Sequence, residues 1–407
     1  MSNTSTPPPH RQLYFLTFVH AVVDSYATVL PHLLPLLLKK LASGTAARNS
    51  LAGLLIAVYS GFSSLAQVFF GWLEDRVRSV HFLTVGVALT AFCMSMLGIA
   101  PFLFLVMILL IIGGAGVAAF HPQATVQAAA LAKQSRGFGV SLFLAGGNVG
   151  RGLGSLSIML LLYRYGLGSS GWCMIPGLFI ASLVPITLKR HDSKDILPSQ
   201  VGIGTPILPE KREDLWQAIR PHLGTFLVLY LIAVLRTATG VGMENFLSLY
   251  FYEQHYDNVA RSVVLALFIF AGSVGIMIGG SLSDRINRYG LMLFSLLAAP
   301  PLLYTSLRST GPLFLILLFV GNLVLSSSIT VNIVLAQQLL PENESIASSF
   351  MMGAAWGVGG ALAIPVGMLA DRFGLATVLD GLVMLPVGTA MLMLFLKREG
   401  RNKAGNI

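Results

Sequence analysis

The chain has 407 residues, of which 55% are hydrophobic and only 11% are charged. A water-soluble protein of this length needs a charged shell of about a quarter of its residues, so the composition excludes a soluble protein. The net charge of +9 is typical of membrane proteins whose cytoplasmic loops are rich in Lys and Arg, and we expect a lipid bilayer as solvent and no nucleic-acid partner.

Apolar runs follow one another along the whole chain, separated by Gly, Pro, Asn or charged residues. Most are near or above the length of about 20 apolar residues that a membrane-spanning helix needs. The runs lie at residues 12–38, 50–72, 80–99, 102–125, 137–162, 170–188, 222–251, 260–280, 290–308, 312–338, 345–366 and 376–396. They predict an all-α integral membrane protein with twelve transmembrane helices and no room for a large soluble domain.

The basic residues indicate the orientation. An even number of spans places both termini on one side of the membrane. With the termini inside, the inside segments hold 17 Lys and Arg residues and the outside loops hold 7. Because cytoplasmic loops are enriched in Lys and Arg, we expect both termini in the cytoplasm and the chain in the inner (plasma) membrane.

One long polar segment divides the chain. We expect an N-terminal six-helix half at 1–188, a cytoplasmic linker at 189–220 and a C-terminal six-helix half at 221–407. The halves resemble one another at an offset of 209 residues (284 − 75), which relates Asp75 to Asp284. A duplicated helical bundle with its site between the repeats is a common transporter plan, and such a chain is sufficient as a monomer.

A short motif follows the second predicted helix and returns after the eighth. Its two copies contain Gly71, Asp75 and Arg76, and Gly280, Asp284 and Arg285. A third copy, from Gly367 to Arg372, lies on the predicted outer side. These motifs resemble the major facilitator superfamily. The resemblance implies a twelve-helix fold in two halves, with the first two copies serving as cytoplasmic gates.

A narrower set of motifs resembles the fosmidomycin-resistance branch of that family. The set includes His20-x-x-x-Asp24, Phe120-His121-Pro122, Gly146-Gly-Asn148-x-Gly150 and Leu340-Pro341-Glu342-Asn343. The resemblance implies a drug efflux protein driven by proton antiport, with a role in antibiotic resistance. Arg151 departs from the small residue expected of the branch, which puts a shared substrate in doubt.

Asp24 is the first candidate for proton coupling. It lies near the middle of the first span, where a carboxylate costs several kcal/mol unless it is paired, protonated or hydrated. His20 lies one helical turn away on the same face and can tune or relay the proton. Structural hydrogen bonds are the alternative for both residues. His121, followed by Pro122, is as well explained by a role in ending the fourth helix.

Arg151 and Arg236 are the other charges that lipid does not tolerate. Arg236 lies mid-span, and Glu244 lies two turns further on the same face. Arginine binds carboxylates and phosphonates with two hydrogen bonds, so one hypothesis is a site for an anionic substrate. The other is an internal ion pair of Arg236 with Glu244 or Asp24, and the sequence does not separate the two.

Polar and small residues within the spans supply the remaining candidates. The polar ones, expected to line a central cavity, are Asn148, Gln127, Asn245, Asn332 and Trp356. The small ones, expected to permit close helix packing, are Gly146, Gly150, Gly154, Gly353 and Gly357. We find no spacing typical of a metal site, a nucleotide site or a catalytic nucleophile, and we expect no enzyme and no cofactor.

The sequence therefore predicts a proton-coupled secondary transporter, most consistent with a drug/proton antiporter that exports a small amphipathic or anionic compound. One alternative is a proton-coupled uptake symporter for an organic anion, which needs the same fold and the same carboxylate. The other is a membrane receptor or scaffold without transport, which has no reason to bear the cost of charges within the membrane.

Overall fold

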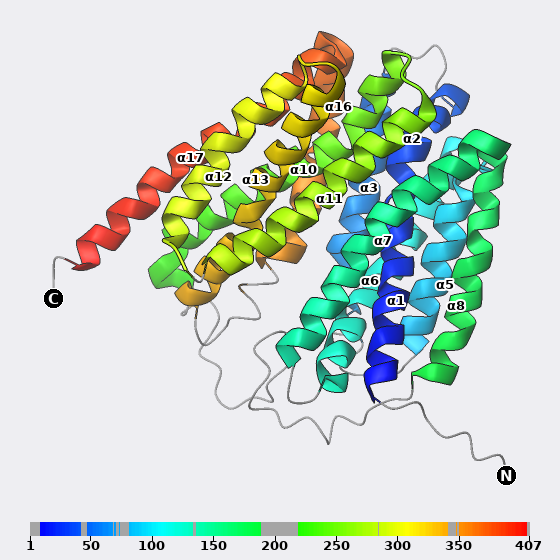
Figure 1. The fold of residues 1–407 in the computed structure, drawn as a ribbon, viewed down its shortest axis with the longest axis horizontal. Coiled ribbons are helices and arrows are strands. Elements are labelled where there is room, and N and C mark those ends of the chain that lie inside the picture. The colour runs from blue at the N-terminus through cyan, green and yellow to red at the C-terminus, as the bar shows by residue number, and fades with distance from the viewer. Residues whose placement is uncertain are drawn as a thin grey trace. The chain divides into compact units, whose positions relative to one another are not determined.

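The computed structural model describes residues 9–41, 47–67, 69–70, 73, 81–132, 136–188, 219–283, 285–340, 347 and 350–404. All regular elements in these residues are helices (Figure 1). Nine helices among them are long and apolar enough to cross a membrane, and His81–Met96 forms a shorter apolar helix. The described part of each of the twelve predicted runs is mostly helical, so the all-α membrane fold is confirmed.

The chain forms two compact units. The first comprises Met1–Arg48, Leu55–Gln200 and Phe251–Ala266, and the second comprises Asn49–Leu54, Val201–Tyr250 and Leu267–Ile407. All but the last two residues of the predicted linker at 189–220 lie outside the described residues, so the boundaries of the predicted halves remain a prediction.

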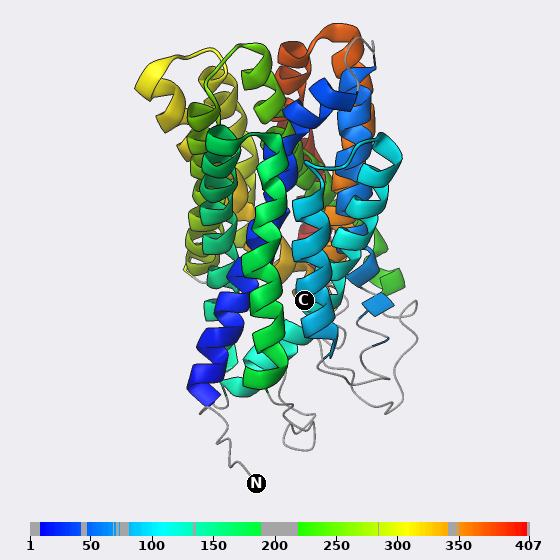
Figure 2. The same cartoon turned by 90° about the vertical axis from the view of Figure 1, so that its right-hand side faces the viewer.

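The first unit is a bundle of helices that run alongside one another (Figures 1 and 2). Its helices are α1 (Pro9–Ala27), α2 (Val29–Leu41), α5 (His81–Met96), α6 (Leu103–Leu131), α7 (Arg136–Tyr165) and α8 (Met174–Thr187), with the short 3-10 helix η2 (Leu167–Cys173) before α8. Helix α3 (Arg48–Ser64) is divided between the units: Arg48 and the residues from Leu55 onward belong to the first, and Asn49–Leu54 belong to the second. The closest pairs are α1 with α7 and α5 with α6.

Prolines shape two of these helices. Pro31 has no N–H to donate to the carbonyl of residue 27, and the first span is broken at Thr28, between α1 and α2. Pro122 lies inside α6, which continues to Leu131. The expectation that His121 and Pro122 end this helix is therefore wrong. Proline is tolerated inside membrane-spanning helices, where neighbouring groups can satisfy the backbone carbonyl that it leaves without a partner.

Glycines bring α1 and α7 into close contact. A β-carbon on Gly146 would lie 2.8 Å from the Thr17 carbonyl oxygen, and one on Gly154 would lie 2.6 Å from the Cα atom of Ser25. A β-carbon on Gly150 would overlap the backbone of Ala21. The spacing of four residues places these glycines on one face of α7, so the backbones approach where side chains would keep them apart.

The second unit contains the remaining helices. They are the short 3-10 helix η4 (Arg220–His222), α10 (Leu223–Glu253, up to Tyr250 in this unit), α11 (Asn258–Ser283, from Leu267), α12 (Arg288–Ser306), α13 (Gly311–Leu339), the π-helical turn η5 (Phe350–Ala354), α15 (Ala355–Ala361), α16 (Ala363–Phe373) and α17 (Leu375–Ala404). Its apolar core includes the fully buried Ile232, Ala233 and Met292. Helix α12 packs against α13 and α17.

The third copy of the short motif has a defined contact in this unit. The Asp371 carboxylate accepts hydrogen bonds from the backbone N–H groups of Asn49 and Ser50, both at 2.7 Å, and from the Ser50 hydroxyl. Asp371 thus caps the first turn of α3, where unpaired amides and the helix dipole favour a negative charge.

Candidate functional site

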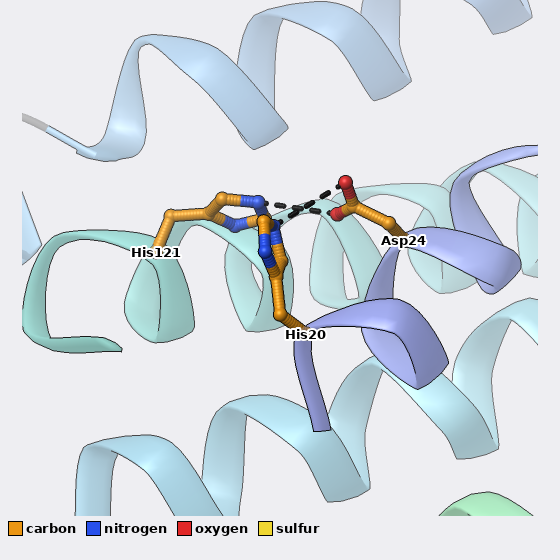
Figure 3. A group of neighbouring side chains, drawn as sticks. All are labelled: His20, Asp24 and His121. Carbon is orange, nitrogen blue, oxygen red and sulfur yellow. Dashed lines mark ion pairs between the residues drawn. The ribbon is translucent and has the colours of Figure 1, made fainter. Parts of the chain in front are cut away.

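Three ionisable side chains meet inside the first unit (Figure 3). His20 and Asp24 lie one turn apart on α1, with His20 Nε2 3.3 Å from Asp24 Oδ2. His121 comes from α6, and its Nε2 lies 3.2 Å from Asp24 Oδ1. Each carboxylate oxygen therefore faces one imidazole. The side chains of His20, Asp24 and His121 are 3%, 16% and 23% exposed, so the group is largely withdrawn from solvent.

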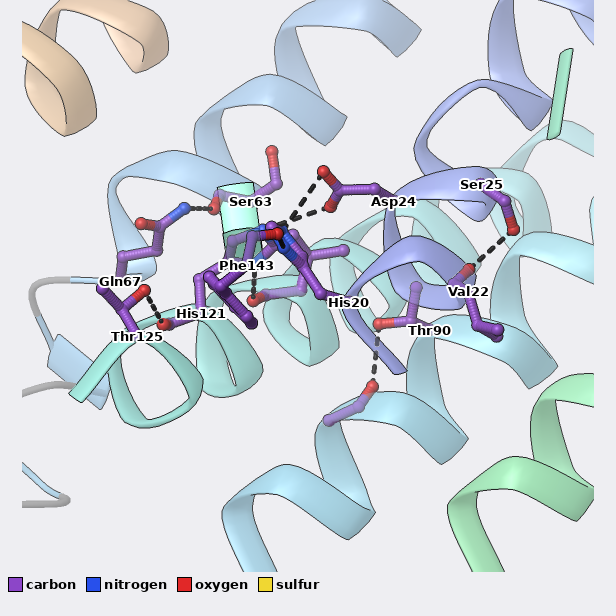
Figure 4. Close-up of polar contacts among 12 residues, drawn as sticks. His20, Val22, Asp24, Ser25, Ser63, Gln67, Thr90, His121, Thr125 and Phe143 are labelled. Carbon is purple, nitrogen blue, oxygen red and sulfur yellow. Dashed lines mark hydrogen bonds and ion pairs between the residues drawn. The ribbon is translucent and has the colours of Figure 1, made fainter. Parts of the chain in front are cut away.

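Backbone carbonyls orient both imidazole rings (Figure 4). His20 Nδ1 lies 2.7 Å from the carbonyl oxygen of Phe143, and His121 Nδ1 lies 2.9 Å from that of Val117. A carbonyl oxygen only accepts, so each Nδ1 carries the hydrogen. In a neutral ring, Nε2 is then left with a lone pair directed at Asp24.

This arrangement has places for two further protons. An unprotonated Nε2 and an ionised carboxylate are both acceptors, so a proton is needed between His20 and Asp24 and another between His121 and Asp24. The formal charge of the group rises from −1 with neither proton, through zero, to +1 with both. The group can therefore take up and release protons with little rearrangement, whichever atom holds them.

Aromatic side chains and one glycine enclose the group. The His20 ring stacks on Phe143 at a centroid distance of 3.9 Å, and Phe120 contacts His121 edge-on at 5.6 Å. A β-carbon on Gly147 would lie 2.6 Å from Asp24 Oδ2 and 2.7 Å from His20 Nε2. Residue 147 must therefore be glycine for the carboxylate and the imidazole to occupy these positions.

Arg151, one turn beyond Gly147 on α7, is close enough for its charge to act on His121. It is half-buried and has interactions of its own. Like charges repel, so Arg151 and a doubly protonated group disfavour one another. Asn148 on α7 and Gln127 on α6, both predicted to line a cavity, are half-buried.

Within the part of the chain that the structure describes, His20, Asp24 and His121 are the one group of three His, Cys, Asp or Glu side chains whose possible metal-ligand atoms lie within 4.8 Å of one another. Imidazole nitrogen and carboxylate oxygen are donor types that a divalent transition-metal ion also accepts. The sequence predicts no metal, and that expectation remains a prediction.

In the second unit, Arg236 on α10 is 4% exposed, and its Nε has no hydrogen-bond partner. Among the described residues, no ion pair joins Arg236 to a carboxylate. Glu244 has partners of its own, and the ion pair of Arg236 with Glu244, one of the two hypotheses, is not among the contacts of the described residues. A buried guanidinium without a carboxylate is suited to receiving an anion from outside the chain.

The other predicted polar residues of the second unit have local partners or are half-buried. Asn245 donates to the Val241 carbonyl oxygen at 2.8 Å. Asn332 donates to the Leu229 carbonyl oxygen at 3.3 Å. Trp356 on α15 is half-buried.

Most of the predicted gating motif is not described. Gly71, Asp75, Arg76 and Asp284 lie outside the described residues. Gly280 lies near the end of α11, and Arg285 follows that helix, with its N–H bonded to the Leu282 carbonyl oxygen at 2.9 Å. Gly353 lies in η5 and Gly357 in α15.

Sequence reasoning left one part of the site undecided and missed another. It explained His121 equally well by a role in ending the fourth helix, and it did not single out Gly147 beside Gly146. Another histidine of the first span, His32 on α2, is fully buried and hydrogen-bonded to the Ser155 hydroxyl at 2.6 Å. The available signal for His121 was its position inside an apolar run, where an ionisable residue is itself a functional indicator.

Comparison with known proteins agrees with this fold. Residues 13–364 match the Major Facilitator Superfamily. The chain belongs to this superfamily. It is therefore an integral membrane transporter rather than an enzyme, and a small-molecule substrate and a bilayer environment follow from that membership.

Two relatives are each 26% identical to the chain. One is an uncharacterized MFS-type transporter, YfnC, of Bacillus subtilis, matched over 92% of this chain and 90% of its own. The other is the fosmidomycin resistance protein of Escherichia coli, matched over 86% of this chain and 84% of its own. The expected resemblance to the fosmidomycin-resistance branch is thus confirmed.

Solved structures share the fold at low sequence identity. A bacterial homolog of the human lysosomal transporter Spinster, inward-facing and occupied, has a TM-score of 0.80 at 15% identity and covers 97% of this chain and 98% of that one. A point mutant of the nucleoside transporter NupG has a TM-score of 0.70 at 13% identity and covers 95% of this chain and 99% of that one. At these identities the likeness concerns the fold alone.

Proposed function

We propose that this transporter is a drug/proton antiporter that exports a small amphipathic or anionic compound by alternating access of its two six-helix halves. The observation that carries the proposal is the orientation of His20 and His121, whose Nε2 atoms both face Asp24 while their Nδ1 atoms donate to carbonyls. Such a group exchanges protons without losing its backbone hydrogen bonds.

The resemblance to the fosmidomycin resistance protein supports export and suggests the compounds to try first. Arg236 supports an anionic or partly anionic substrate, because a buried guanidinium binds phosphonate or carboxylate with paired hydrogen bonds. Arg151 is a second candidate, through its position beside the histidines. In this account the proton occupies the first unit and the arginine of the second unit contacts the substrate.

The proposal is tested in inverted vesicles with an acid interior. A pH-sensitive dye reports the gradient while a panel of compounds that includes fosmidomycin is added. We expect one compound to dissipate the gradient with the wild-type protein but not with Asp24→Asn. Asp380→Asn is the matched control, because it removes a carboxylate that pairs with Arg308 elsewhere in the chain. Gradient discharge by Asp24→Asn equal to that of the wild type overturns the proposal.

Uptake of an organic anion with protons is the second candidate, favoured by the buried Arg236. It predicts that right-side-out vesicles accumulate the anion when the outside is acid and that no compound discharges the gradient in inverted vesicles. Membership in a family of transporters counts against the third alternative, a receptor or scaffold.

The topology that accompanies this proposal has both termini in the cytoplasm and the chain in the inner membrane as a monomer. Single cysteines at Ser2 and Asn406, in a background without Cys93 and Cys173, are expected to react with a membrane-impermeant maleimide only in inverted vesicles. Labelling in intact spheroplasts would reverse the assignment.

A further inference from the structure

A second polar region lies in the first unit, at the end of the bundle away from the N-terminus. It is a cavity of about 470 Å³, within the size range of small-molecule sites. The ends of α2 and α10, the starts of α3 and α11 and the connection between α10 and α11 surround it. The lining residues are Lys39, Arg48, Tyr252, Glu253, His255, Tyr256 and Arg261.

Positive charge dominates this lining. The lining has three cationic side chains, those of Lys39, Arg48 and Arg261, and one carboxylate, that of Glu253. The Glu253 carboxylate lies 3.7 Å from the Arg48 guanidinium. Asp257, next to the cavity, acts on Arg261, but its carboxylate also accepts hydrogen bonds from the first amides of α11. The lining therefore has a surplus of cations, and a bound anion would offset their mutual repulsion.

The two arginines are held in place by one aromatic ring. The Arg261 guanidinium carbon lies 5.1 Å from the centroid of Tyr252, and that of Arg48 lies 5.5 Å from it. Arg261 is only 1% exposed. Fixing guanidinium groups before a ligand arrives lowers the entropy that binding costs, and an arginine out of water interacts more strongly with an anion than one at the surface.

Lys39 and Lys40, adjacent in the sequence, have different surroundings. Lys40 donates a hydrogen bond to the carbonyl oxygen of Ala100, in the connection between α5 and α6, at 2.9 Å. Its ammonium group is therefore already engaged. Lys39 is exposed and lines the cavity. The cavity thus has a buried cation, Arg261, and an accessible one, Lys39.

We propose that this cavity is an anion-binding site for a phosphate- or phosphonate-type group. Such a group accepts the paired N–H bonds of arginine and the point charge of lysine. A soluble organic anion and an anionic lipid headgroup both present this chemistry. The site is separate from the group around Asp24 and does not depend on proton coupling.

The test uses the full chain in nanodiscs of zwitterionic phosphatidylcholine, titrated with inorganic phosphate at fixed ionic strength. Thermal unfolding reads binding, with chloride as the comparison ion. We expect saturable stabilisation by phosphate. Lys39→Gln should weaken phosphate binding by about two- to fivefold, and Arg261→Lys, which keeps the charge but loses the paired geometry, by about tenfold.

Two further variants distinguish specific phosphate binding in the cavity from a non-specific effect of the protein's net charge. Glu253→Gln removes the competing carboxylate and should tighten phosphate binding by about two- to fivefold. Arg164→Gln, at an exposed position in the last turn of α7, changes the net charge as Lys39→Gln does and should leave binding unchanged. Equal losses in Lys39→Gln and Arg164→Gln would overturn the proposal.

The lipid composition identifies the source of the anion. If phosphatidylglycerol in the nanodisc stabilises the wild type and suppresses phosphate binding, the ligand is a lipid headgroup. If phosphate binds equally with both lipids, the ligand is a soluble anion. If neither phosphate nor phosphatidylglycerol stabilises the protein in a manner sensitive to Lys39→Gln, there is no anion site here. Binding by Asp24→Asn should equal that of the wild type, so failure of this proposal is distinguishable from failure of proton antiport.

Discussion

The two units carry different chemistry at equivalent positions. The repeat offset of 209 residues (284 − 75) relates α6 (Leu103–Leu131) to α13 (Gly311–Leu339) within one residue at each end. The same offset takes His20, Asp24 and His121 to Leu229, Ala233 and Thr330. Leu229 and Ala233 belong to the apolar core of the second unit. The fold is thus repeated, whereas the ionisable group occurs at these positions only in the first unit.

The glycines show the same division. Gly150, which lets α7 approach α1, corresponds to Gly359, where a β-carbon would lie 2.9 Å from the Val234 carbonyl oxygen of α10. Gly147, which makes room for Asp24 and His20, corresponds to Trp356. Close helix packing is common to both units, but the space for a buried carboxylate is not. We infer that duplication preserved packing and that proton chemistry was confined to one repeat.

The largest effect is expected when a carboxylate is placed in the second unit. Ala233→Asp introduces a charge at the position equivalent to Asp24, without the histidines that accompany Asp24. An uncompensated buried charge should cost about 3–5 kcal/mol in the free energy of unfolding, seen as a lower melting temperature of the purified protein. Ala233→Asn, with the same shape and no charge, should cost less. Wild-type stability of Ala233→Asp would show that the second unit tolerates a buried carboxylate at this position as the first unit does.

Gly147→Ala tests whether the space beside Asp24 is essential. The added methyl group should clash with Asp24 and His20, cost about 1–3 kcal/mol and abolish gradient-driven transport. Gly152→Ala is the control on the same helix, because nothing lies within 4 Å of the added carbon; alanine is the better helix former, so stability should be unchanged or slightly higher. Equal effects of the two variants would show that the space beside Asp24 is not what residue 147 provides.

Each histidine should provide one of the two places for a proton beside Asp24. Either His20→Gln or His121→Gln is expected to remove one of these places and so to lower gradient-driven transport. His81→Gln, at an exposed position at the start of α5, should leave gradient-driven transport unchanged. Wild-type gradient-driven transport in both His20→Gln and His121→Gln would exclude the imidazoles from proton transfer.

The smallest effect is expected for the ion pair between Arg308 and Asp380 in the second unit. Two hydrogen bonds of 2.7 Å join these side chains, and they raise the pKa of Arg308 above its ordinary value. The pair is exposed and screened by solvent. Arg308→Gln should therefore leave melting temperature and transport near wild type, and a loss of coupling would place proton chemistry in the second unit as well.

The fold was predictable because a bilayer imposes length and apolarity on each span, and twelve such runs are visible in the sequence. Asp24 and His20 were predictable for a related reason, since an ionisable residue in a span is costly and their spacing of four is local. His121 and Gly147 were not, because their roles depend on α6 and α7 packing against α1, about 100 and 125 residues away in the chain.

The most direct test of the central claim compares two modes of transport by Asp24→Asn in proteoliposomes. Counterflow exchange of labelled substrate needs binding and alternating access but no net proton movement, whereas accumulation driven by a pH gradient needs both. We expect Asp24→Asn to retain counterflow and to lose gradient-driven accumulation. Accumulation at the wild-type level, or loss of both activities, would contradict the assignment of proton coupling to Asp24.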